Sequence, residues 1–408
     1  MLAIYLFLCL VFVLIGRNYY RNYINPITIY SVVWFMAFFA HESSYVAFDY
    51  ISWGTFWIIV LAHVAFFFGS IAGTKYVRHT KRIVLFREKR EEDRKKSIIR
   101  WIVVLSVVAL IGIAPSFIYN LSHYGLNVFR NFAALYKMQL TSEFESGFDL
   151  SSILFVVSPL ICIYILTYGW SNWLIIPIID ILLFGLNNGS RGSLIIIFTM
   201  LISNLTIRKK ESKKIEGKQR RILYVIGAIM IAIVVACTRS RSLSTGKTDS
   251  TNSVLTFVVT YLGGGIGCLD KYLKNPIIVN YPQYFFRVPY LILNRLGFTH
   301  VDTTYRIPTY FIPFSSNVIT YIGELYHDFQ MGFFIIIFLL AFVMSSVYSK
   351  AVEYNSTTNK MFYASFFTIV VLSFFANFGH TASVWYVLMI GGFIGCEVDY
   401  HLVKKSIR

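Results

Sequence analysis

The chain has 408 residues, of which 56% are hydrophobic and only 14% are charged. Soluble domains carry about 25% charged residues, so this composition excludes an ordinary soluble globular protein. The net charge of +17 would suit a nucleic-acid-binding protein, but much of the basic excess lies in clusters between apolar segments, as in membrane proteins. We therefore expect one polytopic membrane domain over residues 1–408, with the lipid bilayer and no nucleic acid as a partner.

Apolar segments of nearly bilayer-spanning length recur along the chain. They predict an all-α membrane protein with about eleven transmembrane helices, or up to about thirteen. The first segment lacks the basic start and the small-residue cleavage site of a signal peptide, so we expect it to be a span. The predicted spans are 1–16, 26–40, 52–73, 98–119, 151–168, 172–187, 191–207, 222–237, 331–349, 361–378 and 381–396.

Basic residues set the predicted orientation, because cytoplasmic loops retain Lys and Arg. Segment 75–100 has eleven Lys and Arg against four acids, and segment 208–221 has eight against two. With eleven spans, both segments fall on one side, together with Arg17–Arg21, the 350–360 connection and the C-terminus. We expect a multi-pass protein of the bacterial inner (plasma) membrane, with its N-terminus outside and its C-terminus in the cytoplasm. The five cysteines form no close-spaced pair, so neither a disulfide framework nor a zinc site is expected.

The largest predicted external loop covers residues 238–330, and it contains two apolar, helix-length segments at 254–268 and 284–296. These segments are interfacial helices, re-entrant helices or a further pair of spans. The loop is rich in tyrosine, phenylalanine and arginine. Arginine matches phosphate oxygens and the aromatic rings suit sugars, although both residue types also serve as lipid-interface anchors. Several arginines near the outer headgroup level would suit a diphosphate, and those of this loop are Arg239, Arg241, Arg287, Arg295 and Arg306.

Two local motifs stand out on the predicted external side. The turn Asn187–Ser193 joins two spans and places Arg191 at the end of one of them, as a phosphate ligand or as a snorkelling residue of an ordinary hairpin. The stretch Ser315–Phe329 holds Glu324, His327 and Asp328, which share one face of a helix by their spacing. A carboxylate or imidazole there can deprotonate a hydroxyl. The alternative is a solvated polar helix start, and no second His or Cys cluster supports a metal.

Three further polar residues lie in or near apolar spans. Asp180 falls in the middle of a predicted span, where a carboxylate needs a polar partner or cavity. We interpret it as structural rather than catalytic. His63 lies in the third span, where it can be neutral, and His380 lies near the external end of the last hairpin.

The layout resembles Wzy-type O-antigen and capsular polysaccharide polymerases. The resemblance covers most of the chain in layout, and in sequence it rests on Ser190–Gly192 and on Thr320–Phe329. The Arg-x10-Gly pattern of some members is absent, and Gln330 stands where related sequences tend to have glycine.

The resemblance implies a glycosyltransferase that needs no metal or cofactor and joins undecaprenyl-diphosphate-linked oligosaccharide repeat units. It implies diphosphate binding by Arg191, Arg239, Arg241, Arg287 and Arg306. Glu324 or His327 would orient or deprotonate the acceptor hydroxyl. A chain-length regulator and a flippase of the same pathway are the implied protein partners.

Two alternatives remain open. An O-antigen ligase would move the finished glycan onto another lipid, and sequence does not separate it from a polymerase. A flippase or transporter of the same lipid-linked sugars usually has repeated halves and polar sites at the bilayer midplane. We see no repeat, and the polar residues gather outside, which favours an enzyme.

Overall fold

The computed structural model describes residues 1–43, 46–80, 90–125, 150–188, 191–207, 217, 221–228, 253–277, 279, 281–303, 307–312 and 315–400. The fold of this part is all-α apart from one two-stranded ladder, in which Tyr310–Phe311 (β1) pairs antiparallel with Ser315–Ser316 (β2). The chain forms two compact units. The first contains α1, α2, α3 and α10 to α12, and the second contains α4, α6, α7, α8 and α16. Helices α13 and α14 contribute residues to both.

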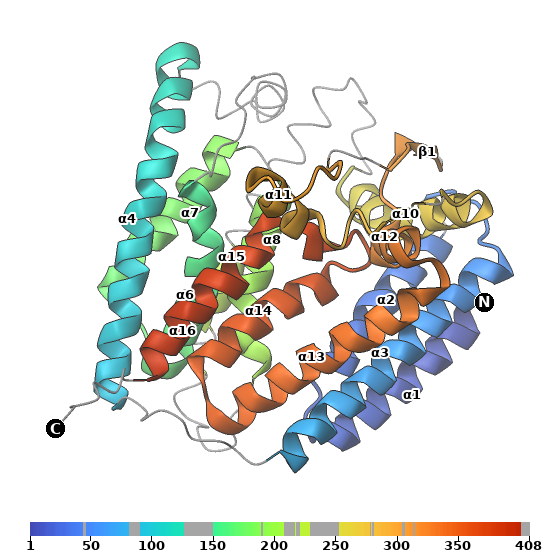
Figure 1. The fold of residues 1–408 in the computed structure, drawn as a ribbon, viewed down its shortest axis with the longest axis horizontal. Helices are drawn as coiled ribbons and strands as arrows, with labels where there is room; N and C mark the ends of the chain where they lie inside the picture. Colours follow the sequence, from blue (N-terminus) through green and yellow to red (C-terminus); the bar gives the residue numbers. More distant parts are fainter. Residues whose placement is uncertain are drawn as a thin grey trace. The chain divides into compact units, whose positions relative to one another are not determined.

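The helices follow one another along the chain as Figure 1 labels them. The α-helices are α1 (Leu2–Tyr20), α2 (Pro26–Glu42), α3 (Trp53–His79), α4 (Glu91–Tyr124), α6 (Leu154–Tyr168), α7 (Ile175–Asn188), α8 (Arg191–Ser203), α10 (Ser253–Lys274), α11 (Arg287–Arg295), α12 (Thr320–Phe329), α13 (Phe333–Tyr354), α14 (Thr357–Val371), α15 (Ala382–Tyr386) and α16 (Gly392–Asp399). Short 3₁₀ turns are η2 (Leu150–Ile153), η3 (Asn172–Leu174), η4 (Asn204–Thr206), η5 (Gln330–Gly332) and η6 (Phe378–His380), and η7 (Val387–Gly391) is a π-helical turn.

Six helical segments of the described chain are long and apolar enough to cross a membrane, which indicates a polytopic membrane protein. Two shorter apolar segments, Asn172–Asn187 and Gly192–Thr206, accompany them. The six are Leu2–Tyr20, Trp53–His79, Glu91–Ser122, Leu150–Tyr168, Thr320–Tyr354 and Ala382–Asp399.

Helix occurs in every predicted span that the structure describes, and the described part of the eighth, 222–228, is also helical. Two boundaries differ from the prediction. Helix α4 begins at Glu91 rather than near 98, because three acids in its first turn favour the positive end of the helix dipole. Helix α14 ends at Val371 rather than near 378, because the chain turns there: the N–H groups of Phe375 and Ala376 both donate to the Leu372 carbonyl.

The first unit is built on closely packed helices. Asn25 caps α2 by accepting the Thr28 N–H at 3.0 Å, and Pro26 occupies the first helical position, which suits its fixed φ. Helices α3 and α13 lie side by side (Figure 1), and a Cβ atom on Gly69 or Gly73 would collide with backbone carbonyls of α13. This spacing of small residues allows the backbones to approach closely, as in other membrane helix pairs.

His63 lies in the core of this unit. Its Nδ1 is 3.0 Å from the Tyr5 hydroxyl and its Nε2 is 2.8 Å from Ser31 Oγ. The imidazole therefore joins α1, α2 and α3, and both ring nitrogens have partners. This is a structural use of histidine inside an apolar bundle.

The second unit packs α4, α6, α7 and α8 together, with a polar contact between α4 and α7. Asn187 accepts a hydrogen bond from Asn120 at 2.7 Å and donates one to Ser116 Oγ at 2.6 Å. Asp180 lies two turns earlier on α7 and is buried. Its Oδ2 atom has no hydrogen-bond partner in the part of the chain that the structure describes.

The predicted external loop, where described, is folded. Its first apolar segment is the 22-residue helix α10, and its second is the nine-residue α11, which is too short to span a bilayer. The buried carboxylate of Asp270 joins α10 to the start of α3: its Oδ1 accepts the Ser52 N–H and the Thr55 hydroxyl, both at 2.8 Å. Lys274 lies 2.6 Å from its Oδ2. Burial alone would raise the pKa of Asp270, but these hydrogen bonds outweigh it and hold the pKa below its usual value.

Candidate functional site

Helix α12 carries the acid and histidine residues that the sequence singles out. The helix begins at Thr320, whose φ of 62° is left-handed, and ends at Phe329, just before Gln330, whose φ is 48°. The Tyr321 N–H donates to the Ser373 carbonyl at 2.9 Å, which fixes the start of α12 to the turn after α14. Glu324, His327 and Asp328 therefore lie on one helix, as their expected shared face requires, and all three are buried.

Glu324 faces the connection between α14 and α15. Its Oε2 accepts the Asn377 N–H at 3.0 Å and lies 3.3 Å from His380 Nδ1. The His380 contact has the distance of an ion pair but not the angles of a hydrogen bond, so it is electrostatic and requires a protonated imidazole. Oε1 makes no hydrogen bond to the described part of the chain. Among the described residues, the hydrogen bond and the ion-pair contact of this carboxylate therefore both fall on Oε2.

His327 lies one turn further along α12 and points toward α10. Its Nδ1 is 3.1 Å from the Tyr272 hydroxyl, and its Nε2 is 3.5 Å from Gln283 Oε1. The Tyr284 ring packs edge-on against it, with ring centroids 5.4 Å apart, and the same ring lies 6.0 Å from His380. His327 and His380 thus border one aromatic side chain, and the contacts of His327 fix its ring orientation.

Asp328 organises the backbone of the loop before α11. Its carboxylate accepts three consecutive backbone N–H groups, from Gln283 at 3.0 Å, Tyr284 at 3.2 Å and Phe285 at 2.6 Å. Three donors on one carboxylate satisfy most of its acceptor capacity. Asp328 is therefore a structural clamp, and its role is to hold the Tyr284 ring beside both histidines.

Arg287 is the one predicted arginine ligand whose side chain is described. It begins α11, and its N–H donates to the Tyr284 carbonyl at 3.3 Å, so its backbone adjoins the loop that Asp328 holds. Arg191 begins α8 in the second unit, and its side chain lies outside the described residues, as do Arg239, Arg241 and Arg306 entirely. The diphosphate-binding prediction remains open for all five.

The cluster has the groups needed for acid–base chemistry. A buried carboxylate with one unengaged oxygen can accept a proton, and a neighbouring histidine can stabilise its charge or take the proton onward. In the described part of the chain, no group of three or more His, Cys, Asp or Glu side chains is arranged to hold a metal ion. The sequence motif predicted Glu324 and His327, but the approach of Asn377 and His380 depends on the turn after α14, which periodicity does not reveal.

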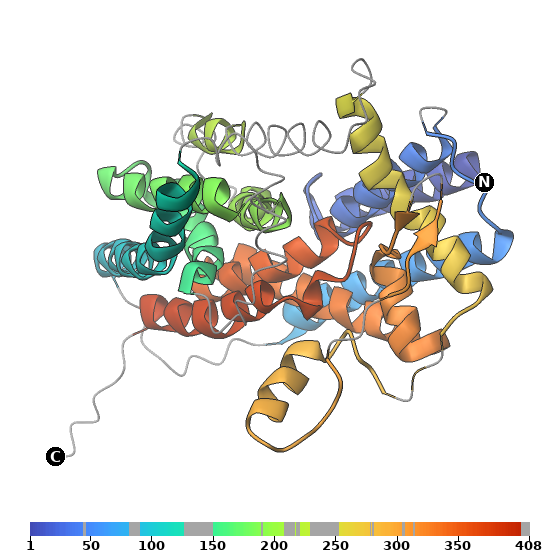
Figure 2. The ribbon, with the colours of Figure 1, turned by 90° about the horizontal axis from the view of Figure 1, so that it is seen from above.

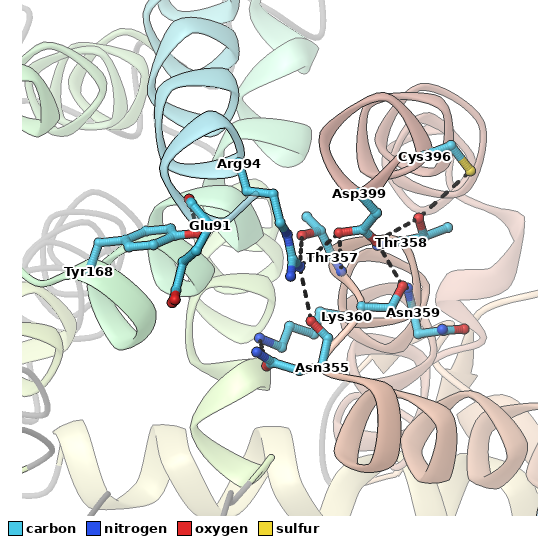
Figure 3. Close-up of polar contacts among 11 residues, drawn as sticks. Glu91, Arg94, Tyr168, Asn355, Thr357, Thr358, Asn359, Lys360, Cys396 and Asp399 are labelled. Carbon is cyan, nitrogen blue, oxygen red and sulfur yellow. Dashed lines mark hydrogen bonds and ion pairs between the residues drawn. The ribbon is translucent and has the colours of Figure 1, made fainter. Parts of the chain in front are cut away.

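A second polar cluster, to which no sequence motif points, surrounds Asp399 in the second unit (Figure 3). Arg94 donates to Asp399 Oδ1 at 2.8 Å, and the N–H groups of Thr357 and Thr358 donate at 3.0 and 3.1 Å. The Ser356 hydroxyl donates to Oδ2 at 2.8 Å. Asp399 thus caps the N-terminus of α14 from about forty residues further along the chain, in favourable alignment with the helix dipole. No local motif predicts this contact, because its partners are about forty and three hundred residues away.

Comparisons of this chain with protein-family models, with curated proteins and with solved structures found no match.

Proposed function

We propose that this protein polymerises undecaprenyl-diphosphate-linked oligosaccharide repeat units on the outer face of a bacterial inner membrane. The observation that carries the proposal is Glu324, a buried carboxylate whose Oε2 contacts Asn377 and His380 while Oε1 makes no hydrogen bond to the residues that the structure describes. The resemblance of Thr320–Phe329 and Ser190–Gly192 to Wzy-type polymerases supplies the substrate class. The six apolar helices support a membrane-embedded enzyme that acts on a lipid-linked substrate.

In this reaction a hydroxyl of the incoming repeat unit attacks the anomeric carbon of the growing glycan. The bond between that carbon and the diphosphate oxygen breaks, a glycosidic bond forms, and undecaprenyl diphosphate leaves with the bonding electrons. Glu324 takes the hydroxyl proton through Oε1. General base catalysis of this kind contributes about 10²–10⁴-fold to a rate.

The histidines have supporting roles in this proposal. The His380 imidazole lies 3.3 Å from Oε2 of Glu324 and helps to orient the carboxylate. His327 packs against the buried Tyr284 ring and so helps to fix the position of that ring, which also borders His380. We assign His327 to positioning rather than to proton transfer because both of its ring nitrogens already face hydrogen-bond partners.

Negative charge grows on the leaving diphosphate, and fixed cations stabilise that charge in the transition state. Arg287 adjoins the Asp328-held loop and is the arginine that we place nearest to this chemistry. Arg191, Arg239, Arg241 and Arg306 are the further proposed ligands. The guanidinium group suits this role because it stays charged and binds phosphate oxygens in a bidentate manner.

Deletion of the gene in its host, followed by gel analysis of the surface polysaccharide, tests the proposal. We expect a ladder of polymer lengths to collapse to a single repeat unit. The deletion strain is then complemented with the wild-type gene, with Glu353→Gln or with Glu324→Gln. Glu353 is an exposed acid on α13 and serves as the control. A ladder that returns with the first two genes but not with Glu324→Gln would support the assigned site. An unchanged ladder in the deletion strain would overturn the polymerase proposal.

Other outcomes of the same gel identify the alternatives. A ligase mutant would leave no glycan on the acceptor lipid while lipid-linked polymer accumulates. A flippase mutant would lose surface glycan with single repeat units retained inside. One observation favours the flippase: among the described residues, Oδ2 of the buried Asp180 has no hydrogen-bond partner, and transporters place polar groups within the membrane.

A further inference from the structure

The segment from Phe286 to Val301 forms a self-contained protrusion of the first unit. Figure 2 shows α11 and the turn after it extending away from the other helices of that unit, at the bottom of the view. Val288 is buried at the root of α11. One turn further on, the same helix face is exposed at Leu291 and Ile292, so the helix extends past the surface against which it is packed.

The protrusion is ordered by its own hydrogen bonds. At the end of α11, Gly297 adopts a φ of 76°, its N–H donates to the Asn294 carbonyl, and the Phe298 N–H donates to the Leu293 carbonyl at 2.9 Å. This is a Schellman-type helix end. The Asn294 side chain then bonds both the N–H and the carbonyl of Val301, at 3.1 and 2.7 Å, which closes the returning chain onto the helix.

The tip of this ordered protrusion is apolar. Phe298 is 74% exposed and Leu296 is 63% exposed. Satisfied backbone groups around exposed large apolar side chains indicate an interaction surface. We call the following residues the α11 tip: Leu291, Ile292, Leu296 and Phe298.

Two observations identify what covers the α11 tip. First, Phe285 packs edge-on against Phe329 with ring centroids 5.6 Å apart. Phe329 lies two residues before Met331, which begins an exposed apolar stripe that continues along α13 at a spacing of four residues through Ile335 and Leu339. On a membrane-spanning helix such a stripe faces lipid, so the root of α11 lies beside the end of a lipid-facing surface.

Second, the charges of the protrusion suit a phospholipid surface. Arg287 and Arg295 stand at the two ends of α11, and Asp302 is the acid that follows. Arg295 is exposed on the same side of the helix as Leu291 and Ile292, by the three- and four-residue spacing. An apolar face beside exposed arginine is typical of helices that lie in the interface between headgroups and acyl chains.

We propose that the α11 tip inserts into the interfacial region of the adjoining phospholipid leaflet, with Arg295 bound to anionic headgroups. The protrusion is then a membrane anchor for the loop that Asp328 holds. This inference rests on the membrane-spanning helices and on the α11 contacts, and it holds whether or not the protein is a polymerase.

Spin labelling of the full-length protein tests the anchor. Phe298→Cys is compared with Phe311→Cys, because Phe311 lies on β1 in the same loop and is 73% exposed. Both are placed in a Cys396→Ser background, since Cys396 is the exposed cysteine among the described residues, and the labelled parent supplies the background signal. Each variant is reconstituted in phosphatidylcholine vesicles, with or without phosphatidylglycerol. The spin label collides with oxygen, which concentrates in the bilayer, and with a water-soluble nickel complex. The ratio of the two collision rates reports how deeply the label lies in the bilayer.

We expect the oxygen-to-nickel ratio at Phe298→Cys to exceed that at Phe311→Cys several-fold. Phosphatidylglycerol should raise the ratio at position 298 further, and Arg295→Gln should abolish that rise. Equal, water-like ratios at both positions would overturn the anchor. So would a signal at position 298 that is lost on dilution of protein in lipid, because a second copy of the chain would then cover the tip.

Discussion

Glu324 and Asp399 are both buried carboxylates beside a basic side chain, but their surroundings differ. Asp399 accepts hydrogen bonds from Arg94, from Ser356 and from two backbone N–H groups of α14, so both of its oxygens are engaged. Glu324 has one backbone donor and one histidine at Oε2, while Oε1 makes no bond to the described chain. Asp399 meets a permanently charged arginine, whereas Glu324 meets a histidine, which is charged only when it is protonated.

The difference separates a structural acid from a candidate catalytic acid. A carboxylate that caps a helix and accepts hydrogen bonds at both oxygens is fixed in place by the fold. A carboxylate with an unengaged oxygen can exchange a proton with a ligand. Loss of Glu324 should therefore remove activity and spare the fold, whereas loss of Asp399 should do the reverse.

The largest expected effect is that of Glu324→Gln on polymerisation. Glutamine keeps the shape and can still accept the Asn377 N–H, but it cannot take a proton. We expect the rate of chain extension to fall by about 10²–10⁴-fold, measured as glycan length in membranes matched for protein amount. Glu353→Gln should match the wild type. Full activity of Glu324→Gln together with His327→Ala would refute the catalytic assignment.

Arg287→Ala should have the next largest effect on the polymerisation rate, because it removes a cation from the proposed diphosphate site. The loss of one preorganised charge-stabilising donor reduces a rate by about 10²–10³-fold. Rates are compared with those of Arg221→Ala, which removes an exposed arginine on the predicted cytoplasmic side. A similar small effect of both variants would count against Arg287 as a ligand.

Arg191→Ala tests the second proposed ligand with the same measurement of glycan length. An unchanged glycan length in this variant would exclude Arg191 as a ligand.

Asp399→Ala tests whether Asp399 stabilises the fold without a role in activity. It leaves Arg94 without its carboxylate partner and uncaps α14, which should cost about 3 kcal/mol of stability. We expect a lower thermal midpoint of the purified protein and less protein in the membrane, with unchanged activity per folded molecule. A normal midpoint, or a loss of activity in fully folded protein, would contradict the structural role. A double-mutant cycle with Arg94→Met separates the contribution of the ion pair to stability from that of the helix cap.

Asp270 should show the smallest effect, as a third acid that joins α10 to α3. Its pKa is lowered in the folded protein, so its stabilising contribution is complete above the unfolded pKa of about 3.9 and is lost as pH falls through the folded pKa. Asp270→Asn should lower stability by about 1–2 kcal/mol near neutral pH and flatten the acid limb of the midpoint-versus-pH curve. An unchanged acid limb would show that other carboxylates govern it.

The sequence predicted the helices well because long apolar segments that must satisfy their own backbone groups become helices in a membrane. It also predicted that Glu324, His327 and Asp328 share a helix, because that depends on local spacing alone. Their separate partners could not be predicted. The contact of Glu324 with His380, the clamp of Asp328 on Gln283–Phe285 and the cap of Asp399 on α14 all join segments that are tens of residues apart, and such contacts follow from tertiary packing.

The central claim, that the protein extends lipid-linked glycans with Glu324 as the base, is tested most directly by reconstitution. Purified full-length protein in phospholipid vesicles is given undecaprenyl-diphosphate-linked repeat units, and products are followed by gel and by release of undecaprenyl diphosphate. The account predicts a ladder of multimers with one undecaprenyl diphosphate released per linkage, and almost none with Glu324→Gln. Repeat units that stay monomeric with folded wild-type protein would contradict it. A normal ladder with Glu324→Gln would also contradict it.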